Sequence, residues 1–107
     1  MIDVVWWPKY CRLTVKGHAR SAEEGKDLIC AGASTLAATM AANAEYMEKR
    51  GMLREQTVRL DKGDAEIQCV PVAQCRAIVR LCMESIVVGF EMLAEEYPEY
   101  IRVECLG

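Results

Sequence analysis

Cys30 and His18 are the two residues of this chain whose types and spacing favour nucleophilic chemistry. A catalytic cysteine needs a thiol that ionises readily and a nearby base that accepts its proton. His18 is the only histidine among the 107 residues, and it precedes Cys30 by 12 positions. A loop from the end of a strand at His18 to the start of a helix before Cys30 brings the two side chains within easy reach. If they meet, Cys30 is the candidate nucleophile and His18 the candidate general base.

Two further polar residues share the predicted helix stripe of Cys30. With about 100° of rotation per residue, Asp27 and Ser34 fall within about 60° of Cys30 around the helix. Asp27 is a candidate N-cap residue and also a candidate partner that orients His18. With Asp27 as the N-cap, Cys30 lies in the first turn, where the helix dipole stabilises a thiolate by roughly 0.3 to 1 kcal/mol. Ser34 is placed to hydrogen-bond near the thiolate or the substrate.

Packing roles are the competing interpretation, and spacing alone favours them. Free cysteines are among the most buried residue types and usually act as small hydrophobic side chains. The other cysteines fit this role because each falls on the apolar side of its predicted element: Cys11, Cys69, Cys75, Cys82 and Cys105. Cys30 fits less well, because it lies off the apolar stripe of its helix. In this interpretation His18 is an ordinary surface residue, Asp27 a helix cap and Ser34 a small packing residue.

Hydrophobic patterning predicts the elements that position these residues. A short apolar run predicts a strand at 2–7, alternating apolar and polar residues predict strands at 10–17 and 100–105, and two segments that flank a turn predict paired strands at 56–60 and 65–70. Apolar residues at steps of three and four predict one helix from Asp27 to a cap at Gly51. The same spacing predicts a second helix from about Val72 to Leu93. The order ββαββαβ indicates an α+β fold in one domain over residues 1–107, with two helices on one face of a mostly antiparallel sheet.

Two connections bear on the candidate site. The segment from Gly17 to Gly25 has no apolar periodicity and predicts a surface loop next to His18. In the strand before this loop, alternation places Thr14 on the solvent side. The tetrapeptide 61–64 separates two predicted strands, and Gly63 within it supplies the positive φ that a tight hairpin turn needs.

The second helix carries two apolar stripes. The main one is sufficient to cover the sheet: Val72, Cys75, Val79, Cys82, Ile86, Phe90 and Leu93. A second stripe lies on nearly the opposite side: Ala77, Leu81, Val88 and Met92. A helix that is hydrophobic on two sides needs two partners. From the pattern alone, the second partner is either the first helix of the same chain or another subunit.

Composition and charge exclude several classes of protein. Thirteen Lys and Arg against 16 Asp and Glu give a net charge of -3, so the basic footprint of a nucleic-acid-binding protein is missing. No apolar run approaches the roughly 18 residues of a membrane span, and residues 1–3 do not open a signal peptide. We therefore expect a cytoplasmic protein without direct nucleic-acid or membrane partners.

Cysteine usage argues against a metal centre. Six cysteines in a reducing cytosol predict free thiols rather than disulfide bridges. No C-x-x-C motif occurs, and one histidine does not supply a multi-histidine ligand set. The sequence therefore predicts no metal site and no cofactor.

The segments Gly17-His18-Ala19 and Gly25-Lys26-Asp27-Leu28-Ile29-Cys30-Ala31, followed by Ser34, resemble a known signature. It is that of the Prp family of ribosomal-processing cysteine proteases, in which a Gly-His pair precedes an Asp-x-x-Cys-Ala-x-x-Ser helix start by this interval. The resemblance extends through the hairpin and the second helix to Tyr97 and Pro98. Two positions depart from it: Gly32 stands where alanine is usual, and Arg20 where glycine is common.

The resemblance implies a homodimeric bacterial protease that removes a short N-terminal extension from a large-subunit ribosomal protein. It implies His18 as general base and Cys30 as nucleophile, with Asp27, Ser34 and Gly17 as supporting residues. It also favours a second subunit, rather than the first helix, as the partner of the outer apolar stripe.

Two other classes of function fit the residues. One is a non-enzymatic ribosome-assembly module, in which the cysteines only pack and an acidic surface binds a basic protein. The other is a thiol redox sensor, although no second cysteine lies near Cys30 in the sequence. Selective alkylation of Cys30 near neutral pH discriminates an activated thiol from either alternative.

Overall fold

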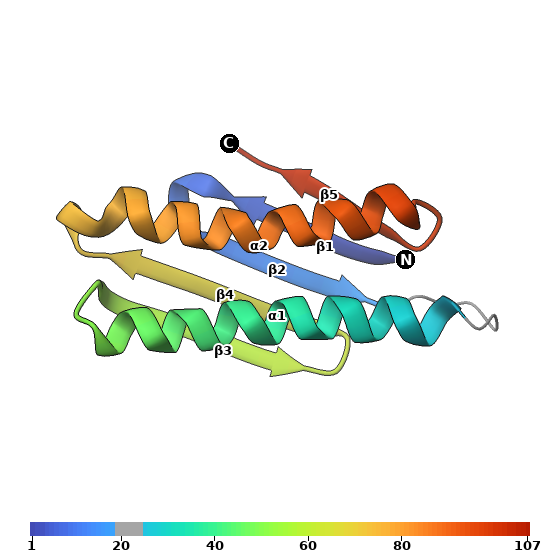
Figure 1. The fold of residues 1–107 in the computed structure, drawn as a ribbon, viewed down its shortest axis with the longest axis horizontal. Helices are drawn as coiled ribbons and strands as arrows, with labels where there is room; N and C mark the ends of the chain where they lie inside the picture. Colours follow the sequence, from blue (N-terminus) through green and yellow to red (C-terminus); the bar gives the residue numbers. More distant parts are fainter. Residues whose placement is uncertain (19–24) are drawn as a thin grey trace.

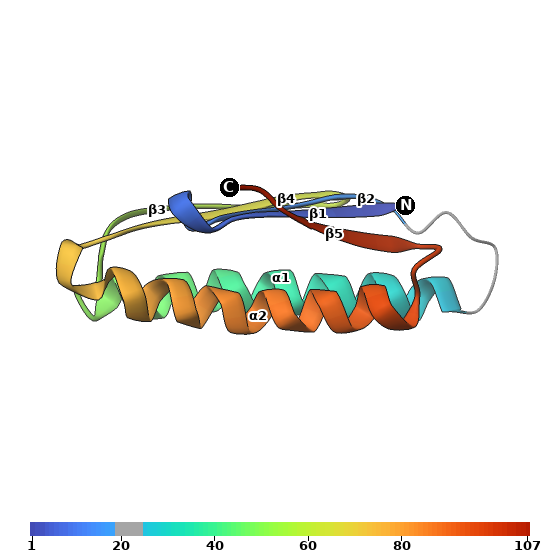
Figure 2. The same cartoon turned by 90° about the horizontal axis from the view of Figure 1, so that it is seen from above.

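The computed structural model describes residues 1–18 and 25–107, with side chains described from residue 28 onward in the second range. A five-stranded sheet forms one layer, and both helices lie against the same face of it (Figures 1 and 2). This confirms the predicted α+β class and element order. The elements are β1 (Ile2–Trp7), β2 (Arg12–Gly17), α1 (Gly25–Lys49), β3 (Leu53–Asp61), β4 (Asp64–Pro71), α2 (Arg76–Glu96) and β5 (Ile101–Cys105), with short 3-10 turns at Pro8–Tyr10 and Ala73–Cys75.

Strand β2 lies at the centre of the sheet. The strand order is β3-β4-β2-β1-β5, and every neighbouring pair is antiparallel except β1 with β5. In the β2–β4 register, Lys16 lies opposite Asp64. The end of β2, where His18 follows, therefore lies beside the turn between β3 and β4.

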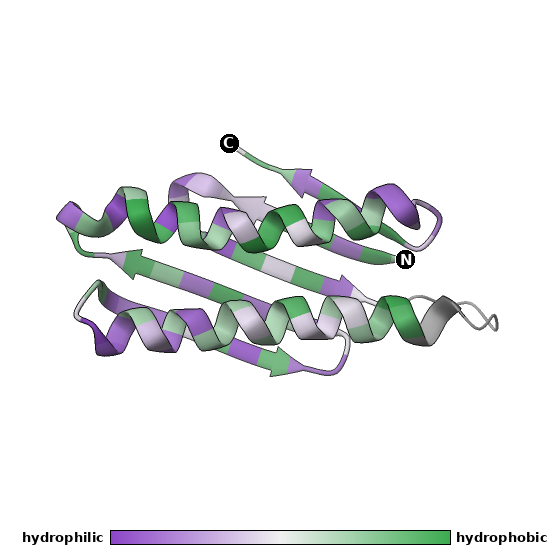
Figure 3. Ribbon diagram, in the orientation of Figure 1, coloured by the Kyte–Doolittle hydropathy of each residue, from purple (hydrophilic) through white to green (hydrophobic). Residues whose placement is uncertain are grey.

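The core fills the space between the sheet and the helices. Every second side chain of a strand points toward the helices, as in β1, where Val4 and Trp6 are buried. Strand β4 shows the same banding of hydrophobic and hydrophilic residues along its length (Figure 3). From the helices, the buried side chains are Ile29, Ala33, Ala37, Met40, Ala41, Ala44, Met47, Val79, Met83, Val87 and Phe90.

The two helices pack closely where each offers a glycine to the other. Gly32 of α1 faces the methyl groups of Leu93, and Gly89 of α2 faces those of Leu36. A Cβ at Gly32 would lie 3.3 Å from Leu93 Cδ1, so the departure from alanine at this position gives the leucine extra room. Because glycine has no side chain, each leucine packs directly against the other helix. The two helices therefore approach closely, and the leucines fill the space between them.

Helix α1 ends at Lys49 and is capped, as predicted, by Gly51. The N–H of Met52 donates to the carbonyl of Met47 at 3.0 Å, and the N–H of Gly51 donates to the carbonyl of Glu48 at 3.0 Å. Together with a φ of +74° at Gly51, these bonds form a Schellman motif.

The structure corrects the predicted start of each helix. Helix α1 begins at Gly25, so the prediction of Asp27 as N-cap is wrong. An acidic residue is favourable throughout the first turn, and so does not mark the cap itself. Helix α2 begins at Arg76 rather than Val72, because Pro71 still pairs with Leu53 in the sheet.

Two burial predictions are also wrong. Thr14 is 3% exposed rather than solvent-facing, because its central strand is flanked by Val5 on one side and Glu66 on the other. Cys105 is exposed rather than packed, since it ends the edge strand β5. The predicted loop between Gly17 and Gly25, with Arg20, lies outside the described residues.

None of the described helices is long and apolar enough to cross a membrane. The second apolar stripe of α2 is exposed to solvent in the single chain: Leu81 is 66%, Val88 52% and Met92 66% exposed. The first helix therefore does not cover this stripe, although the sequence pattern left that arrangement open.

Phe90 tests the packing of α2 on the core. Its side chain is 0% exposed, so Phe90→Ala should lower the free energy of unfolding by about 3–5 kcal/mol through lost burial and a residual cavity. Glu95→Ala, at an exposed position of the same helix, is the matched control and should stay within about 0.5 kcal/mol of the parent. Urea denaturation measures both values, and equal effects would contradict the assigned core.

Candidate active site

A pocket of about 220 Å³ joins the two residues that the sequence singled out. It lies where the end of β2, the N-terminal half of α1 and the β3–β4 turn meet. His18, Cys30 and Ser34 all line it. Residues 12 and 16 positions apart in sequence are therefore brought to one cavity by the return of the chain from strand to helix.

His18 is held through its backbone on two sides. The N–H of Gly17 donates to the carbonyl of Gly63 at 2.9 Å. The carbonyl of His18 accepts a hydrogen bond from the amino group of Met1 at 2.7 Å. A side chain at Gly17 would run into the Met1 carbonyl, so glycine is needed for this close approach. The imidazole itself is exposed on the pocket rim.

Cys30 lies at the border between core and pocket. Its neighbour Ile29 is 0% exposed, whereas Cys30 is half-buried and packs against the edge of the core. Ser34 follows about one helical turn later and is exposed. The predicted stripe is thus confirmed for Cys30 and Ser34. The Asp27 backbone belongs to the first turn of α1, and its side chain lies outside the described residues.

The longer helix changes the electrostatic argument for Cys30. Because α1 begins at Gly25, Cys30 falls in the second turn rather than the first. The stabilisation of an anion by the helix dipole is concentrated in the first turn. Activation of the thiol therefore depends more on a nearby base than the sequence suggested. Between described residues, no hydrogen bond joins the His18 ring to Cys30.

Three of the other thiols, those of Cys11, Cys69 and Cys82, are poorly suited to nucleophilic chemistry. Burial raises the pKa of Cys69 to about 12. Burial also raises the pKa of Cys11, against the opposing effects of Arg80 and Arg76, and that of Cys82. Cys30 is the only cysteine among the described residues that line the pocket. The exposed Cys105 lies on β5, which contributes no residue to that lining.

The described part of the chain offers no set of metal ligands. Within residues 1–18 and 25–107, no three His, Cys, Asp or Glu side chains are grouped so as to hold a metal ion. The polar groups that line the pocket include the Cys30 thiol, the His18 imidazole and the Ser34 hydroxyl.

Sequence reasoning missed one wall of the pocket. Asp61, Lys62, Gly63 and Asp64 of the β3–β4 turn line it together with His18 and Cys30. The tetrapeptide was recognised only as a hairpin turn. The missing signal was the β2–β4 register, which places this turn beside the end of β2.

Comparison with known families bears on the class of protein to which these residues belong. The model of the family described as "Cysteine protease Prp" matches residues 1–102. The chain belongs to this family. It is therefore a cysteine protease.

Solved structures with the same fold come from bacteria. The essential ribosomal processing protease Prp from S. aureus, in complex with a covalently linked product peptide, aligns with a TM-score of 0.67 and 23% identity, over 99% of this chain and 100% of that one. The same protease with a substrate peptide gives a TM-score of 0.65 and 20% identity, over 98% and 97%. SMU.848 from Streptococcus mutans gives a TM-score of 0.66 and 21% identity, over 98% of this chain and 91% of that one. A search of curated proteins finds no match.

Thiol labelling tests the Prp site directly. With limiting iodoacetamide near pH 7, Cys30 should be alkylated before the buried Cys11 and Cys69, because alkylation needs an accessible thiolate. His18→Ala should slow alkylation of Cys30 but leave the exposed Cys105, an internal reference, unchanged. Peptide mass spectrometry measures both rates. A Cys30 rate that does not depend on His18 would contradict activation by the imidazole.

Proposed function

We propose that this Prp-family protease removes a short N-terminal extension from a large-subunit ribosomal protein precursor, with Cys30 as nucleophile and His18 as general base. The observation that carries the proposal is the shared pocket of these two side chains, reached from β2 and from α1. The peptide complexes of the S. aureus protease support a peptide substrate. A net charge of -3 also suits a basic substrate such as a ribosomal protein.

Acylation begins with proton transfer within the pocket. His18 accepts the proton of the Cys30 thiol as Sγ attacks the scissile carbonyl carbon, which forms a C–S bond and a tetrahedral oxyanion. The N–H groups in the first turn of α1 have no acceptor within the helix, so they are available to stabilise this oxyanion.

Collapse of the intermediate releases the first product. The C–N bond breaks, His18 donates its proton to the leaving amine, and the acyl group stays on Cys30 as a thioester. Water, deprotonated by His18, then attacks the thioester and regenerates the thiol. The covalently linked product peptide of the S. aureus protease is consistent with such an acyl step.

The supporting residues have separate roles in this scheme. Ser34, exposed at the pocket about one turn beyond Cys30, hydrogen-bonds the peptide or stabilises charge near Sγ. Asp27, whose backbone belongs to the first turn of α1, is carried over from the family resemblance as a supporting residue that we propose orients His18. Gly17 permits the close backbone approach that fixes the base. We place the reaction in the cytoplasm, where ribosomal proteins are synthesised.

Cleavage of the cognate precursor tests the assignment. Cys30→Ala should abolish removal of the extension, because the reaction then lacks its nucleophile, and His18→Ala should lower kcat by about 100-fold or more. Cys105→Ala is the matched control for a cysteine outside the pocket and should cleave normally. Mass spectrometry of the precursor identifies the cut. Comparable cleavage by Cys30→Ala would overturn the assignment of the nucleophile.

We further propose that the enzyme is a homodimer in which α2 contributes the contact. Leu81, Val88 and Met92 form an exposed apolar stripe that no other described element covers. The family resemblance favours a second copy as its partner, and a two-fold arrangement brings the same stripe from each subunit together.

Solution mass and one pair of substitutions test the dimer. Light scattering should report about twice the chain mass of 12.0 kDa. Leu81→Glu with Val88→Glu should give a folded monomer, because charges at a buried interface lose their hydration. Val58→Glu, at a comparably exposed valine on β3, should remain dimeric. A monomeric parent protein at micromolar concentration would contradict the proposal.

A further inference from the structure

We propose that Gly63 is a positioning residue for His18, and that Arg59 holds it in place through the β3–β4 turn. The missing side chain at Gly63 leaves the space that the imidazole occupies. This inference rests on the proposed function only for the role of His18 as the base. It assigns the hairpin turn, far from both motif segments in sequence, to the machinery that aims this base.

The contact between Gly63 and the imidazole is direct. A Cβ placed on Gly63 would lie within 3.0 Å of both Nε2 and Cε1 of His18, closer than real Cβ contacts. The ring and any side chain at Gly63 therefore exclude each other. Because Nε2 is one of the two ring nitrogens that exchange protons, displacement of the ring moves the base itself.

The same glycine also fixes the backbone that carries the imidazole. The carbonyl of Gly63 accepts the N–H of Gly17 at 2.9 Å, and the next ladder pair along the strands is Lys16 with Asp64. The turn thus holds His18 at two points, the ring and the preceding peptide. A shift of the turn would move both together.

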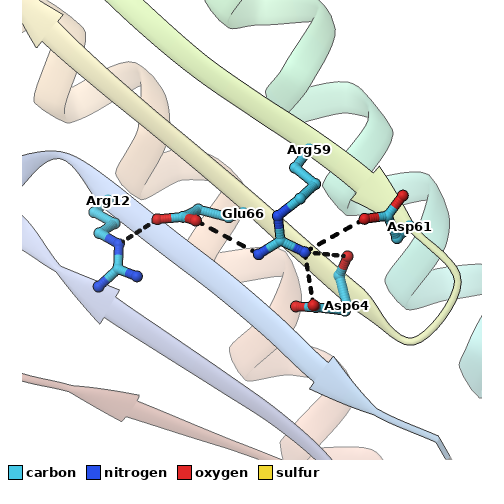
Figure 4. Close-up of polar contacts among 5 residues, drawn as sticks. All are labelled: Arg12, Arg59, Asp61, Asp64 and Glu66. Atoms are coloured by element: carbon cyan, nitrogen blue, oxygen red, sulfur yellow. Dashed lines mark hydrogen bonds and ion pairs between the residues drawn. The ribbon is translucent and has the colours of Figure 1, made fainter.

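Arg59 joins the two ends of the turn (Figure 4). Its Nη1 lies 2.6 Å from Asp64 Oδ2 and 3.5 Å from Asp61 Oδ2, and it donates to the Asp64 carbonyl at 3.2 Å. One guanidinium therefore contacts the residues on both sides of Lys62-Gly63. Isolated surface ion pairs are weak, but these contacts share one planar cation and converge on one turn.

The Arg59 contacts continue to the strand that bears His18. Nη2 of Arg59 lies 3.5 Å from Glu66 Oε1, and Arg12 Nε of β2 lies 2.6 Å from Glu66 Oε2. The hydrogen bond from Arg12 is the main cause of a lowered pKa at Glu66, so this carboxylate stays anionic at neutral pH. The charges span β3, β4 and β2 on the open face of the sheet, opposite the helices.

Gly51 is a control position that distinguishes displacement of the imidazole from backbone strain. Gly63 has a φ of +73° and Gly51 a φ of +74°, so a side chain strains both positions alike. A Cβ at Gly51 would meet nothing within 4 Å. Substitution of either glycine therefore carries a similar backbone penalty, but only substitution of Gly63 displaces the imidazole.

The experiment compares Gly63→Ala with Gly51→Ala, and Gly63→Asn with Gly51→Asn, because asparagine tolerates positive φ but still carries a Cβ. Both sites should lose similar stability in urea. Only the Gly63 variants should lower kcat for precursor cleavage, on the order of 100-fold, with KM little changed. They should also shift the NMR resonance of Hε1 in His18, the only histidine.

Arg59→Lys tests the contacts of Arg59 with the β3–β4 turn, since lysine keeps the positive charge but lacks the planar guanidinium group. It should shift the His18 resonance and lower kcat less than Gly63→Ala does. Arg102→Lys makes the same exchange at an arginine that pairs with Asp3 elsewhere on the sheet. It should change neither the His18 resonance nor kcat.

Two results overturn the inference: a Gly63→Asn protein with parental kcat and an unshifted His18 resonance, or equal resonance shifts in the Gly63 and Gly51 variants. If the parent protein fails to cleave the precursor, the proposed substrate is wrong, and the resonance comparison alone decides the role of Gly63.

Discussion

The antiparallel pairing of β2 with β4 is the constraint on which the site depends. Side chains alternate across a strand, so a slip of one residue would turn Leu13 and Val15 away from the helices. The same slip would also carry the end of β2 past the β3–β4 turn. Burial of the core and the position of His18 are therefore fixed by one register, and the stability of the sheet is what keeps the proposed base in place.

The Prp site combines a rigid half with an exposed half. Cys30 stands on a long helix whose neighbouring residues Ile29 and Ala33 are buried, so the backbone that carries its thiol is held by the core. His18 stands just beyond the last residue of a strand and is exposed. Contacts from Gly63 and Gly17, rather than core packing, define its position. The place of the proposed base therefore depends on glycines, whose lack of a side chain lets the chain segments approach.

The two faces of the sheet do different work. The helix-facing side is apolar and supplies the burial that stabilises the fold. The open side carries charged residues that cross from strand to strand, with Arg12, Glu66 and Arg59 in one row. Such a row contributes little to stability on a solvated surface. Its position behind the active-site turn gives it a role in local geometry that net stability does not reveal.

The sequence by itself determined the fold class, the order of elements and the two residues of the candidate dyad. The fold class and the order of elements follow from local physics, namely alternation along strands and three- and four-residue steps along helices. The candidate dyad rests on the motif at positions 17–34, which resembles the family signature. The family resemblance, confirmed over residues 1–102, fixed the class of enzyme. The start of α1 at Gly25 was missed because an acidic residue suits several positions of a first turn.

Only the tertiary structure decided which distant segments meet at the pocket. The register that sets Gly63 against His18 comes from pairing between strands separated by tens of residues, and no local pattern encodes it. Burial of Thr14 and exposure of Cys105 likewise depend on whether a strand is central or at an edge. The same holds for Leu81 and Val88, whose pattern fits either a neighbouring helix or a subunit until the packing of α1 on α2 leaves them outside. Long-range contacts are chosen by the whole core at once, which is why the sequence offered the candidate dyad but not the turn that lies against His18.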